Sequence, residues 1–368
     1  MGTDIKLEKI ESLFSMEGKP LIIGGPCSAE SEFQILQTAK ALDACNQVKV
    51  FRAGLWKPRT RPNGFEGVGA KGLPWMQRVR KETSLLTAVE VAKPSHVEKV
   101  LKHDIDIIWL GARTTTNPFS VQEIAESLRG VDIPVMIKNP LHADLKLWVG
   151  AMERLNSVGV EKLIAIHRGF YAHHKTPFRN PPLWEIPIEL RRIIPDLPIL
   201  VDPSHICGNT ALIPYLSQKA LDLEMNGLMI EAHFDPDNAL SDAFQQLRPD
   251  EFKKMIDDLV IRKFNGVSLN DSALNALRDE IDRLDDQLIQ ILAQRLEIVE
   301  EIGRYKKEKN LTILQLERWN KVISERVKSG EALGLNKDFM EQILRIIHEE
   351  SIQKQNVIMN TSRKDTGE

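Results

Sequence analysis

The sequence predicts a (β/α)8 TIM barrel, an α/β fold, followed by a smaller all-α domain of three helices. Before about residue 264, short apolar runs alternate with amphipathic segments; after it there is no proline, and apolar residues recur at helical spacing. Most of the runs are apolar throughout, as is typical of parallel strands covered on both faces. Eight of them within roughly 240 residues favour a closed barrel. An open doubly wound sheet is the alternative, but no glycine-rich dinucleotide fingerprint supports it.

Eight segments are expected to be strands, and the segments between them are long enough for crossover helices. The expected strands are residues 21–28, 48–54, 85–92, 105–112, 134–139, 162–169, 198–205 and 227–234. In such a barrel the chemistry lies where the strands end, so polar residues at their carboxyl ends are the candidate site residues.

Length and composition limit the number of domains, the classes of partner and the cellular compartment that can be expected. A chain of 368 residues exceeds what one hydrophobic core usually supports. We divide it into a barrel at 1–264, a linker at 265–269, a helical domain at 270–357 and a disordered tail at 358–368. The net charge of −3 gives no reason to expect nucleic acid or an anionic membrane as partner. Without an apolar signal core or membrane span, and with too few cysteines for a disulfide framework, a cytoplasmic location is expected.

Four residues at strand ends or in the loops after them could form a mixed soft and hard metal site. They are Cys27, His205, Glu231 and Asp242. One thiolate, one imidazole and two carboxylates leave a coordination position open, and such a set accepts manganese, iron, cobalt or zinc. Taken singly, each residue has a plainer interpretation, as a buried small hydrophobe, a turn histidine, a helix cap or an ion-pair partner.

The same strand ends are rich in cations. The basic residues that would converge on one mouth of the barrel are Arg52, Lys57, Arg59, Arg113, Lys138 and Arg168. Cations packed this closely repel one another unless anions neutralise them, so the ligands should carry phosphates or carboxylates. The alternative is that each is a solvated loop charge or the partner of a structural carboxylate.

Five ordered motifs carry a resemblance to a known family. They are Gly25-Pro26-Cys27-Ser28, Lys57-Pro58-Arg59-Thr60, Gly111-Ala112-Arg113, Asp202-Pro203-Ser204-His205 and Leu240-Ser241-Asp242. Over roughly residues 20–260 the chain resembles 3-deoxy-D-arabino-heptulosonate 7-phosphate (DAHP) synthase of the type I beta class. The resemblance implies a barrel that condenses phosphoenolpyruvate with erythrose 4-phosphate, the first step of the shikimate pathway.

The resemblance also implies roles for individual residues. The divalent metal, with Mn²⁺ the first candidate ahead of Fe²⁺, Co²⁺ and Zn²⁺, would be held by Cys27, His205, Glu231 and Asp242. Phosphoenolpyruvate would be bound by Arg52, Lys57, Arg113, Lys138 and Arg168, and erythrose 4-phosphate by Arg59 and Thr60. Lys57 is also a candidate for proton transfer. One departure is Lys138-Asn139-Pro140, where many relatives have Lys-Arg-Gly. The related eight-carbon synthase acting on arabinose 5-phosphate is an alternative, disfavoured by the Lys57–Thr60 loop.

The second part of the chain has a heptad seam. Apolar residues alternate in steps of three and four, with one gap, at Leu274, Leu277, Ile281, Leu284, Leu288, Ile291, Ile298 and Ile302. Arg295 occupies the gap, and an arginine in an apolar seam is costly unless an anion meets it. Lys306, eleven residues later, lies about 20° around the helix on the same face, whereas Arg278 lies about 100° away. A dimerisation coiled coil with a paired arginine would show the same spacing.

Three helices are expected in this part. The first would run from near Asp271 to near Asn310, the second from Leu316 to Val327 with its end before Gly330, and the third from an Asn336 cap to Gln355.

Residues 270–357 resemble the all-helical class of chorismate mutase. The resemblance rests on the spacing of Arg278, Arg295, Lys306, Arg318, Ser351 and Gln355. It implies an intertwined homodimer in which Arg278 reaches the partner's pocket, three arginines hold the carboxylates of chorismate, and Lys306 and Gln355 contact the ether oxygen. Gln315 and Trp319 stand where the family often has acids that would contact the substrate hydroxyl.

The sequence therefore predicts a bifunctional shikimate-pathway enzyme, a synthase (transferase) joined to a mutase (isomerase). We expect prephenate or chorismate, bound by the helical domain, to act as a feedback effector of the barrel. The alternative is a helical module that only dimerises or regulates, without turnover.

Overall fold

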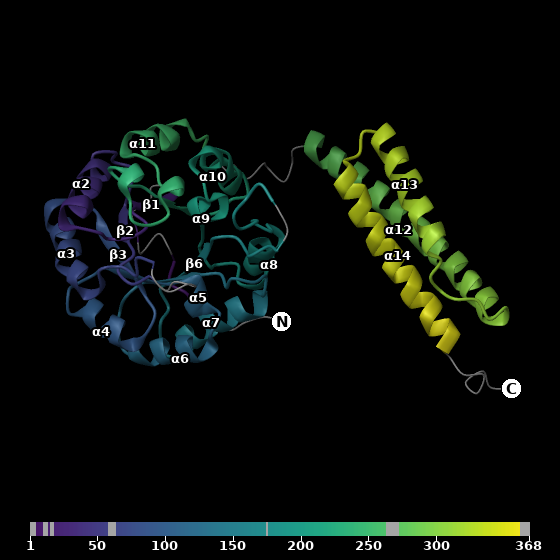
Figure 1. Ribbon diagram of the computed structural model, residues 1–368, viewed down its shortest axis with the longest axis horizontal. Helices are drawn as coiled ribbons and strands as arrows, with labels where there is room; N and C mark the ends of the chain where they lie inside the picture. Colours follow the sequence, from purple (N-terminus) through teal and green to yellow (C-terminus); the bar gives the residue numbers. More distant parts are fainter. Residues whose placement is uncertain are drawn as a thin grey trace. The chain divides into compact units, whose positions relative to one another are not determined.

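The computed structural model describes residues 5–9, 14, 18–57, 64–173, 176–262 and 272–360. The chain separates into two compact units, residues 1–264 and 265–368 (Figure 1). The expected linker at 265–269 lies outside the described residues. None of the helices among the described residues is both long and apolar enough to cross a bilayer.

The first unit is a closed barrel of eight parallel strands in sequence order. The strands are β1 (Leu21–Gly25), β2 (Val50–Ala53), β3 (Leu86–Val91), β4 (Ile107–Leu110), β5 (Val135–Lys138), β6 (Leu163–His167), β7 (Ile199–Val201) and β8 (Gly227–Glu231). Each lies within one of the eight segments predicted as strands, and the barrel prediction is confirmed. The strands are shorter than predicted because the polar residues that follow the apolar runs turn out of the ladder into loops.

Helices surround the strands as an outer ring in Figure 1. They are α2 (Glu32–Asp43), α3 (Leu73–Glu82), α4 (Pro94–Leu101), α6 (Pro118–Ser127), α7 (Leu145–Ser157), α8 (Glu185–Ile193), α10 (Ile213–Asp222) and α11 (Pro249–Asp258). Two short helices, α5 (Ala112–Thr115) and α9 (Pro203–Cys207), directly follow β4 and β7.

Two apolar layers explain why the strand runs are apolar throughout. Side chains that point into the barrel, such as Ile23, Val50 and Trp109, form an interior cluster. Their sequence neighbours, such as Phe51 and Leu110, pack outward against the helices. Both faces of each strand are therefore buried, the arrangement that favours continuous apolar strands.

Gly25 brings the first two strands close together just before the candidate site. Its φ of 144° is a conformation that side chains rarely adopt, and a Cβ there would collide with the backbone carbonyl of Arg52. A glycine is therefore required at this point, where β1 passes β2 and the chain continues to Cys27.

The second unit consists of α12 (Ser272–Glu308), α13 (Leu316–Ala332) and α14 (Lys337–Asn360). The three predicted helices are present, and Asn336 caps the third by accepting a hydrogen bond from the Phe339 amide at 3.0 Å. Two predicted ends are wrong. The second helix continues through Gly330, because this glycine packs against Met340 and leaves no room for a side chain. The third continues past the predicted start of the tail to Asn360, with Lys307 bonded to the Ile358 carbonyl at 2.9 Å.

The apolar seam of α12 faces outward in this single chain. Leu277, Leu284 and Leu288 are exposed to 60%, 58% and 53%. Isolated exposed leucines are ordinary, but a continuous apolar stripe of this length indicates a surface that packs against another protein surface.

A buried histidine at the end of β6 gives the barrel a pH-dependent stability. His167 is packed among Trp148, Phe170 and Trp184, and burial together with the nearby Arg168 lowers its pKa from 6.5 to about 3. Between these two values the unfolded chain binds the proton and the folded chain does not, so stability is complete above pH 6.5 and falls as the pH falls. We expect His167 to contribute a slope of about 1.4 kcal/mol per pH unit in that window.

Urea unfolding of the wild type and of His167→Leu at several pH values between 7 and 4 measures this slope. The variant should be the less pH-dependent of the two. Identical pH dependence in both would contradict the assignment.

Candidate functional site

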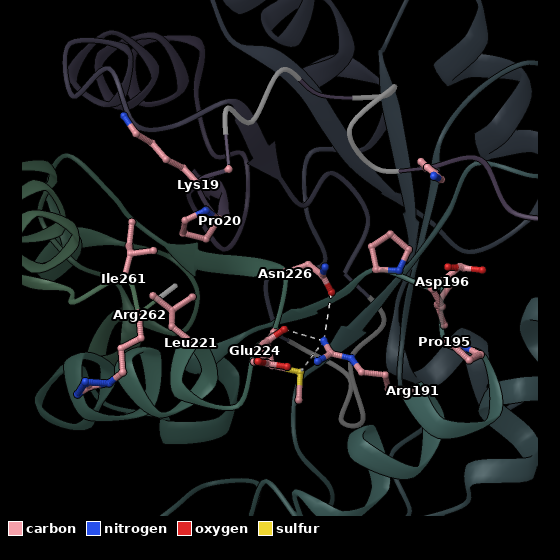
Figure 2. A pocket seen from close by; sticks show the side chains of 15 residues that line it. Lys19, Pro20, Arg191, Pro195, Asp196, Leu221, Glu224, Asn226, Ile261 and Arg262 are labelled. Atoms are coloured by element: carbon pink, nitrogen blue, oxygen red, sulfur yellow. Dashed lines mark hydrogen bonds between the residues drawn. The ribbon is translucent and has the colours of Figure 1, made fainter. Parts of the chain in front are cut away.

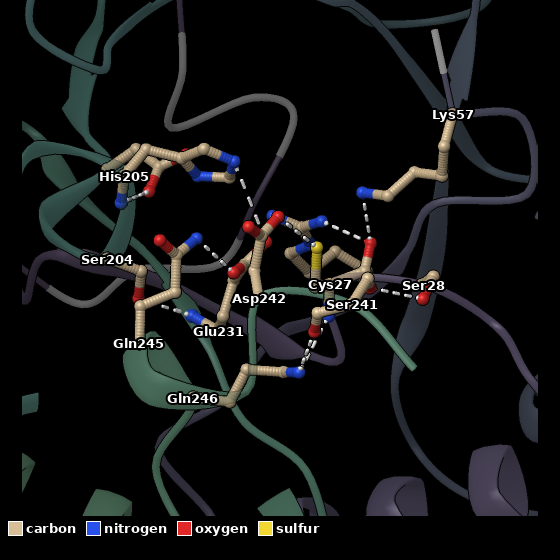
Figure 3. Close-up of polar contacts among 12 residues, drawn as sticks. Cys27, Ser28, Lys57, Ser204, His205, Glu231, Ser241, Asp242, Gln245 and Gln246 are labelled. Atoms are coloured by element: carbon tan, nitrogen blue, oxygen red, sulfur yellow. Dashed lines mark hydrogen bonds and ion pairs between the residues drawn. The ribbon is translucent and has the colours of Figure 1, made fainter. Parts of the chain in front are cut away.

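The four predicted metal-ligating residues meet at the carboxyl ends of the strands, as Figure 3 shows. Cys27 Sγ lies 3.2 Å from Asp242 Oδ2, and His205 Nε2 lies 3.8 Å from Glu231 Oε1. Among the described residues, no three His, Cys, Asp or Glu side chains already form a metal-ion cage. The four groups are arranged as two contacting pairs.

Each carboxylate of these pairs is held by other protein groups. Glu231 accepts from Gln245 Nε2 at 2.7 Å and pairs with Arg52 at 3.2 Å. Asp242, in the left-handed region at φ 46°, pairs with Arg179 at 3.1 Å. The two carboxylates are thus fixed in place close to the thiol and the imidazole.

The electrostatics of the four groups suit a cation. Burial and the carboxylate of Glu231 raise the pKa of Cys27 to about 12, so without a cation it remains a thiol that donates to Asp242. Against the effect of burial, His205 and Arg52 lower the pKa of Glu231, and His205 and Arg179 lower that of Asp242. Two ionised carboxylates, one imidazole and a thiol that a divalent ion would deprotonate form a donor set that fits such an ion.

Asp202 links this group to the predicted phosphate-binding residues. Its side chain is fully buried, lies 2.8 Å from His205 Nδ1, and pairs with Lys138 at 2.7 Å. Its Oδ1 also accepts from the His205 backbone amide, as the cap of α9. One carboxylate therefore orients both the imidazole and the lysine.

Several cationic side chains line a cavity of about 110 Å³ at the mouth of the barrel. Its lining comprises Lys57, Glu90, Gly111, Ala112, Arg113, Lys138, Leu141, Arg168, Arg179, His205 and Asp242. Burial, with Arg179 and Arg113 adding to its effect, lowers the pKa of Arg168 to about 10. Guanidinium groups close enough to disfavour one another's charge form a site that an anion would stabilise.

Arg52 and Lys57 lie beside the thiol. Both donate to the Cys27 carbonyl, at 3.2 Å and 2.6 Å. Arg52 is only 1% exposed and lies over the Trp109 ring. Against the effect of burial, the Glu231 carboxylate raises the pKa of Lys57 and keeps this lysine charged, and Cys27 adds to the effect once its thiol loses the proton.

Sequence reasoning missed Arg179 and the role of Asn139. Arg179 lies in the loop after β6, eleven residues beyond Arg168, and bonds Asp242 and Gln245. No sequence motif marks this arginine within the long loop, and its contacts are with residues more than sixty positions away. Asn139 accepts from the Arg168 backbone amide at 2.7 Å and donates to the Gly169 carbonyl at 2.8 Å. It therefore positions the end of β6.

The two residues predicted to bind erythrose 4-phosphate, Arg59 and Thr60, lie outside the described residues. A larger cavity, of about 750 Å³, is lined by Pro20, Pro198 and Asn226 among others, which precede their strands (Figure 2). It is therefore at the opposite end of the barrel from the chemical groups.

In the helical unit, α12 and α14 bring four of the predicted residues together. Arg295 donates to Ser351 Oγ at 2.6 Å. Lys306 donates to the Ile313 carbonyl at 2.5 Å, and Gln355 to the Ser351 carbonyl at 3.3 Å. Burial lowers the pKa of both Arg295 and Lys306. The two cations thus stand on a partly buried polar face.

Arg318 and Arg278 are placed differently. Arg318 is exposed in the first turn of α13, beside Trp319. Arg278 is exposed on α12 near Asn275, and the seventeen positions from Arg278 to Arg295 span about 25 Å of helix. It cannot reach the same pocket within one chain.

Comparisons with known proteins agree with both units. Residues 5–262 match the DAHP synthetase I family, and residues 277–356 match chorismate mutase type II. The chain is 32% identical over 238 residues to a phospho-2-dehydro-3-deoxyheptonate aldolase of Thermotoga maritima, covering 65% of this chain and 68% of that protein. It is 42% identical over 83 residues to the T-protein of Enterobacter agglomerans, covering 23% of this chain and 22% of that protein.

A solved structure supports the barrel assignment. The crystal structure of the phospho-2-dehydro-3-deoxyheptonate aldolase (DAHP synthase) of Thermotoga maritima matches with a TM-score of 0.60 and 29% identity, covering 69% of this chain and 75% of that one. The predicted pairing of a synthase barrel with a mutase domain is confirmed at the level of the two families. The chain belongs to the DAHP synthetase I family and carries a chorismate mutase type II domain at its C-terminal side.

Proposed function

We propose that the barrel condenses phosphoenolpyruvate with erythrose 4-phosphate to give DAHP and phosphate. The observation that carries this proposal is the cation-lined cavity directly beside Cys27, His205, Glu231 and Asp242. Phosphoenolpyruvate carries a carboxylate and a phosphate, and both anions suit the cations of the cavity. Its binding residues would be Arg52, Lys57, Arg113, Lys138 and Arg168, with Arg59 and Thr60 holding erythrose 4-phosphate.

A divalent metal fits the donor set formed by the same four residues. When bound, it would supply Lewis-acid stabilisation to the aldehyde oxygen as that oxygen gains negative charge. Manganese is our first candidate, with iron, cobalt or zinc as alternatives, because a mixed thiolate, imidazole and carboxylate set accepts all of them.

The protein's own residues would position the reactants and handle protons. As C3 of phosphoenolpyruvate attacks the aldehyde carbon, positive charge develops at C2, water adds there, and phosphate leaves. Arg168 and Lys138 would hold phosphoenolpyruvate in line for this attack, a proximity effect that can be large. Lys57, whose charge the Glu231 carboxylate favours, would donate a proton to the new alkoxide.

A substrate-swap assay tests the synthase function. Loss of phosphoenolpyruvate is followed in the presence of erythrose 4-phosphate and, separately, arabinose 5-phosphate. We expect turnover with erythrose 4-phosphate and none with arabinose 5-phosphate. Preference for arabinose 5-phosphate would mean that the barrel is the eight-carbon synthase instead.

For the helical unit, the proposed reaction is the rearrangement of chorismate to prephenate. Arg295 and Arg318 would hold the substrate carboxylates, together with Arg278 of a second copy. Lys306 and Gln355 would bond the ether oxygen, where negative charge grows in the transition state. Ser351 would orient Arg295, as its hydrogen bond to that side chain indicates.

The proposal includes a homodimer formed through α12. The outward apolar seam and the distance of Arg278 from Arg295 both favour a second copy packed along this helix. We expect Leu284→Glu, which places a charge in the middle of the seam, to shift sedimentation from dimer to monomer. Lys328→Glu, on another helix of the same unit, is the control, and an unchanged dimer in the Leu284 variant would argue against this interface.

A feedback link between the two units is also proposed, with prephenate or chorismate as effector. In this scheme the helical unit binds the late product, and binding lowers the synthase rate. Prephenate should inhibit the synthase of the full chain, whereas a chain ending at residue 265 should be insensitive. The full-length Arg318→Ala variant, with weakened binding, should need more prephenate for the same inhibition. Undiminished inhibition of the truncated barrel would place the effector site within the barrel.

A further inference from the structure

Trp319 and His348 form a stacked pair in the helical unit. Their ring centroids are 3.7 Å apart and the rings are inclined by only 9°. Trp319 lies on α13 and His348 on α14, so the stack fixes the imidazole plane from a neighbouring helix. An indole in this position cannot accept a hydrogen bond from a substrate, because its only polar group is an N–H donor.

The imidazole lies on the same helix face as two of the predicted mutase residues. His348, Ser351 and Gln355 are spaced by three and four residues and therefore share one face of α14. Ser351 contacts Arg295 at 2.6 Å. Burial first, and then the charges of Arg295 and Lys306, lower the pKa of His348, which favours the neutral imidazole.

Two polar atoms on this face of α14 lack a partner among the described residues. Within the described part of the chain, His348 Nε2 and Gln355 Oε1 are buried and make no hydrogen bond. A buried polar atom without a partner costs free energy, so a pair of them on one helix face indicates that a polar ligand completes the site.

We propose that the neutral imidazole of His348, held in place by Trp319, hydrogen-bonds the ring hydroxyl of the substrate. This inference rests on the mutase function proposed above and adds a substrate-binding residue to it. The cations account for the two carboxylates of chorismate, and Lys306 and Gln355 account for its ether oxygen. The ring hydroxyl is the polar group that remains, and a neutral imidazole can donate to it or accept from it.

The test compares chorismate with an analogue in which hydrogen replaces the ring hydroxyl. The wild-type full chain should prefer chorismate by tenfold to hundredfold in kcat/KM, on the order expected when a buried polar group loses its partner. His348→Leu should prefer it by less than about threefold, and His348→Gln, which keeps a hydrogen-bonding group, should restore part of the preference. His103→Leu, at a partly exposed histidine of the barrel unit, is the control and should behave as the wild type.

Trp319 is tested as a positioning residue. Trp319→Phe retains a ring against the imidazole and should keep most of the preference, whereas Trp319→Ala should lose it. Circular dichroism melting of each variant separates this effect from unfolding.

Other results would overturn the inference. Equal losses for both substrates in His348→Leu would show that the histidine only packs. Absence of wild-type turnover would instead contradict the mutase function. In that case the role of His348 is tested by calorimetry, which compares the binding affinity of a bicyclic ether dicarboxylate that carries a ring hydroxyl with that of the same compound without it. A His348→Leu variant that still distinguishes the two dicarboxylates as the wild type does would then refute the assignment.

Discussion

Cys27→Ala is expected to lower the synthase activity by more than about a hundredfold, since even residues that only support metal ligands typically cost 10–100-fold. The Cys27 thiol contacts the Asp242 carboxylate. The side chains of Arg52 and Lys57 donate hydrogen bonds to the backbone carbonyl of Cys27. The thiol pKa of about 12 without a cation means that a bound divalent ion must displace the proton. A methyl group offers no donor, and the carboxylates of Glu231 and Asp242 would retain only their protein partners.

The same effect should follow from removal of the metal. Treatment with EDTA should abolish phosphoenolpyruvate consumption, and added Mn²⁺ should restore it in the wild type but not in Cys27→Ala. Metal content per chain, measured by atomic emission, should fall in parallel. Chorismate turnover by the same sample reports that the helical unit is intact.

Cys45→Ala is the matched control. Cys45 is also buried in the barrel unit, but it follows α2 and its thiol donates to the carbonyl of Ala41 in the last turn of that helix, away from the carboxyl ends of the strands. It should retain full activity and metal content. Full wild-type activity in EDTA, or a Cys27→Ala variant that still responds to Mn²⁺, would require a different ligand set.

The barrel was predictable because its signals are local. An apolar run such as Ile199–Val201, ended by Asp202 and Pro203, specifies a buried strand and the turn at its carboxyl end. Barrel closure then brings such turns together without further information, and this is why Cys27 and His205 could be grouped from sequence alone. The predicted chemical roles of these residues remain to be measured.

What escaped prediction depends on contacts between distant residues. Arg179 reaches Asp242 across 63 positions of sequence from the middle of a long loop, where no periodicity marks it. Gly330 normally signals a helix end, yet packing against Met340 overrides that preference. The position of the His348 imidazole, with its unpartnered nitrogen, could likewise not be predicted, because it depends on the packing of Trp319 from α13 against this ring.

Arg295→Ala should decide whether the helical unit is a catalyst or only a regulatory or dimerising module. The guanidinium is half-buried, bonded to Ser351, and stands on the face that carries Lys306 and Gln355. Truncating one partner of a buried, hydrogen-bonded charge pair costs about 2–5 kcal/mol, which corresponds to roughly 30- to 5,000-fold in kcat/KM. Arg295→Lys should fall between, because an ammonium keeps the charge but loses the planar fork that matches a carboxylate.

Arg304→Ala on the same helix is the control, because Arg304 is exposed and its ion pair with Glu300, at 3.9 Å, is long and solvent-accessible. It should leave chorismate turnover unchanged, and both variants should keep the synthase activity of the barrel. If Arg295→Ala converts chorismate as fast as Arg304→Ala, the polar face of α12 and α14 does not bind the reacting substrate. The cost of placing a cation in an apolar seam would then have to be explained by assembly or effector binding alone.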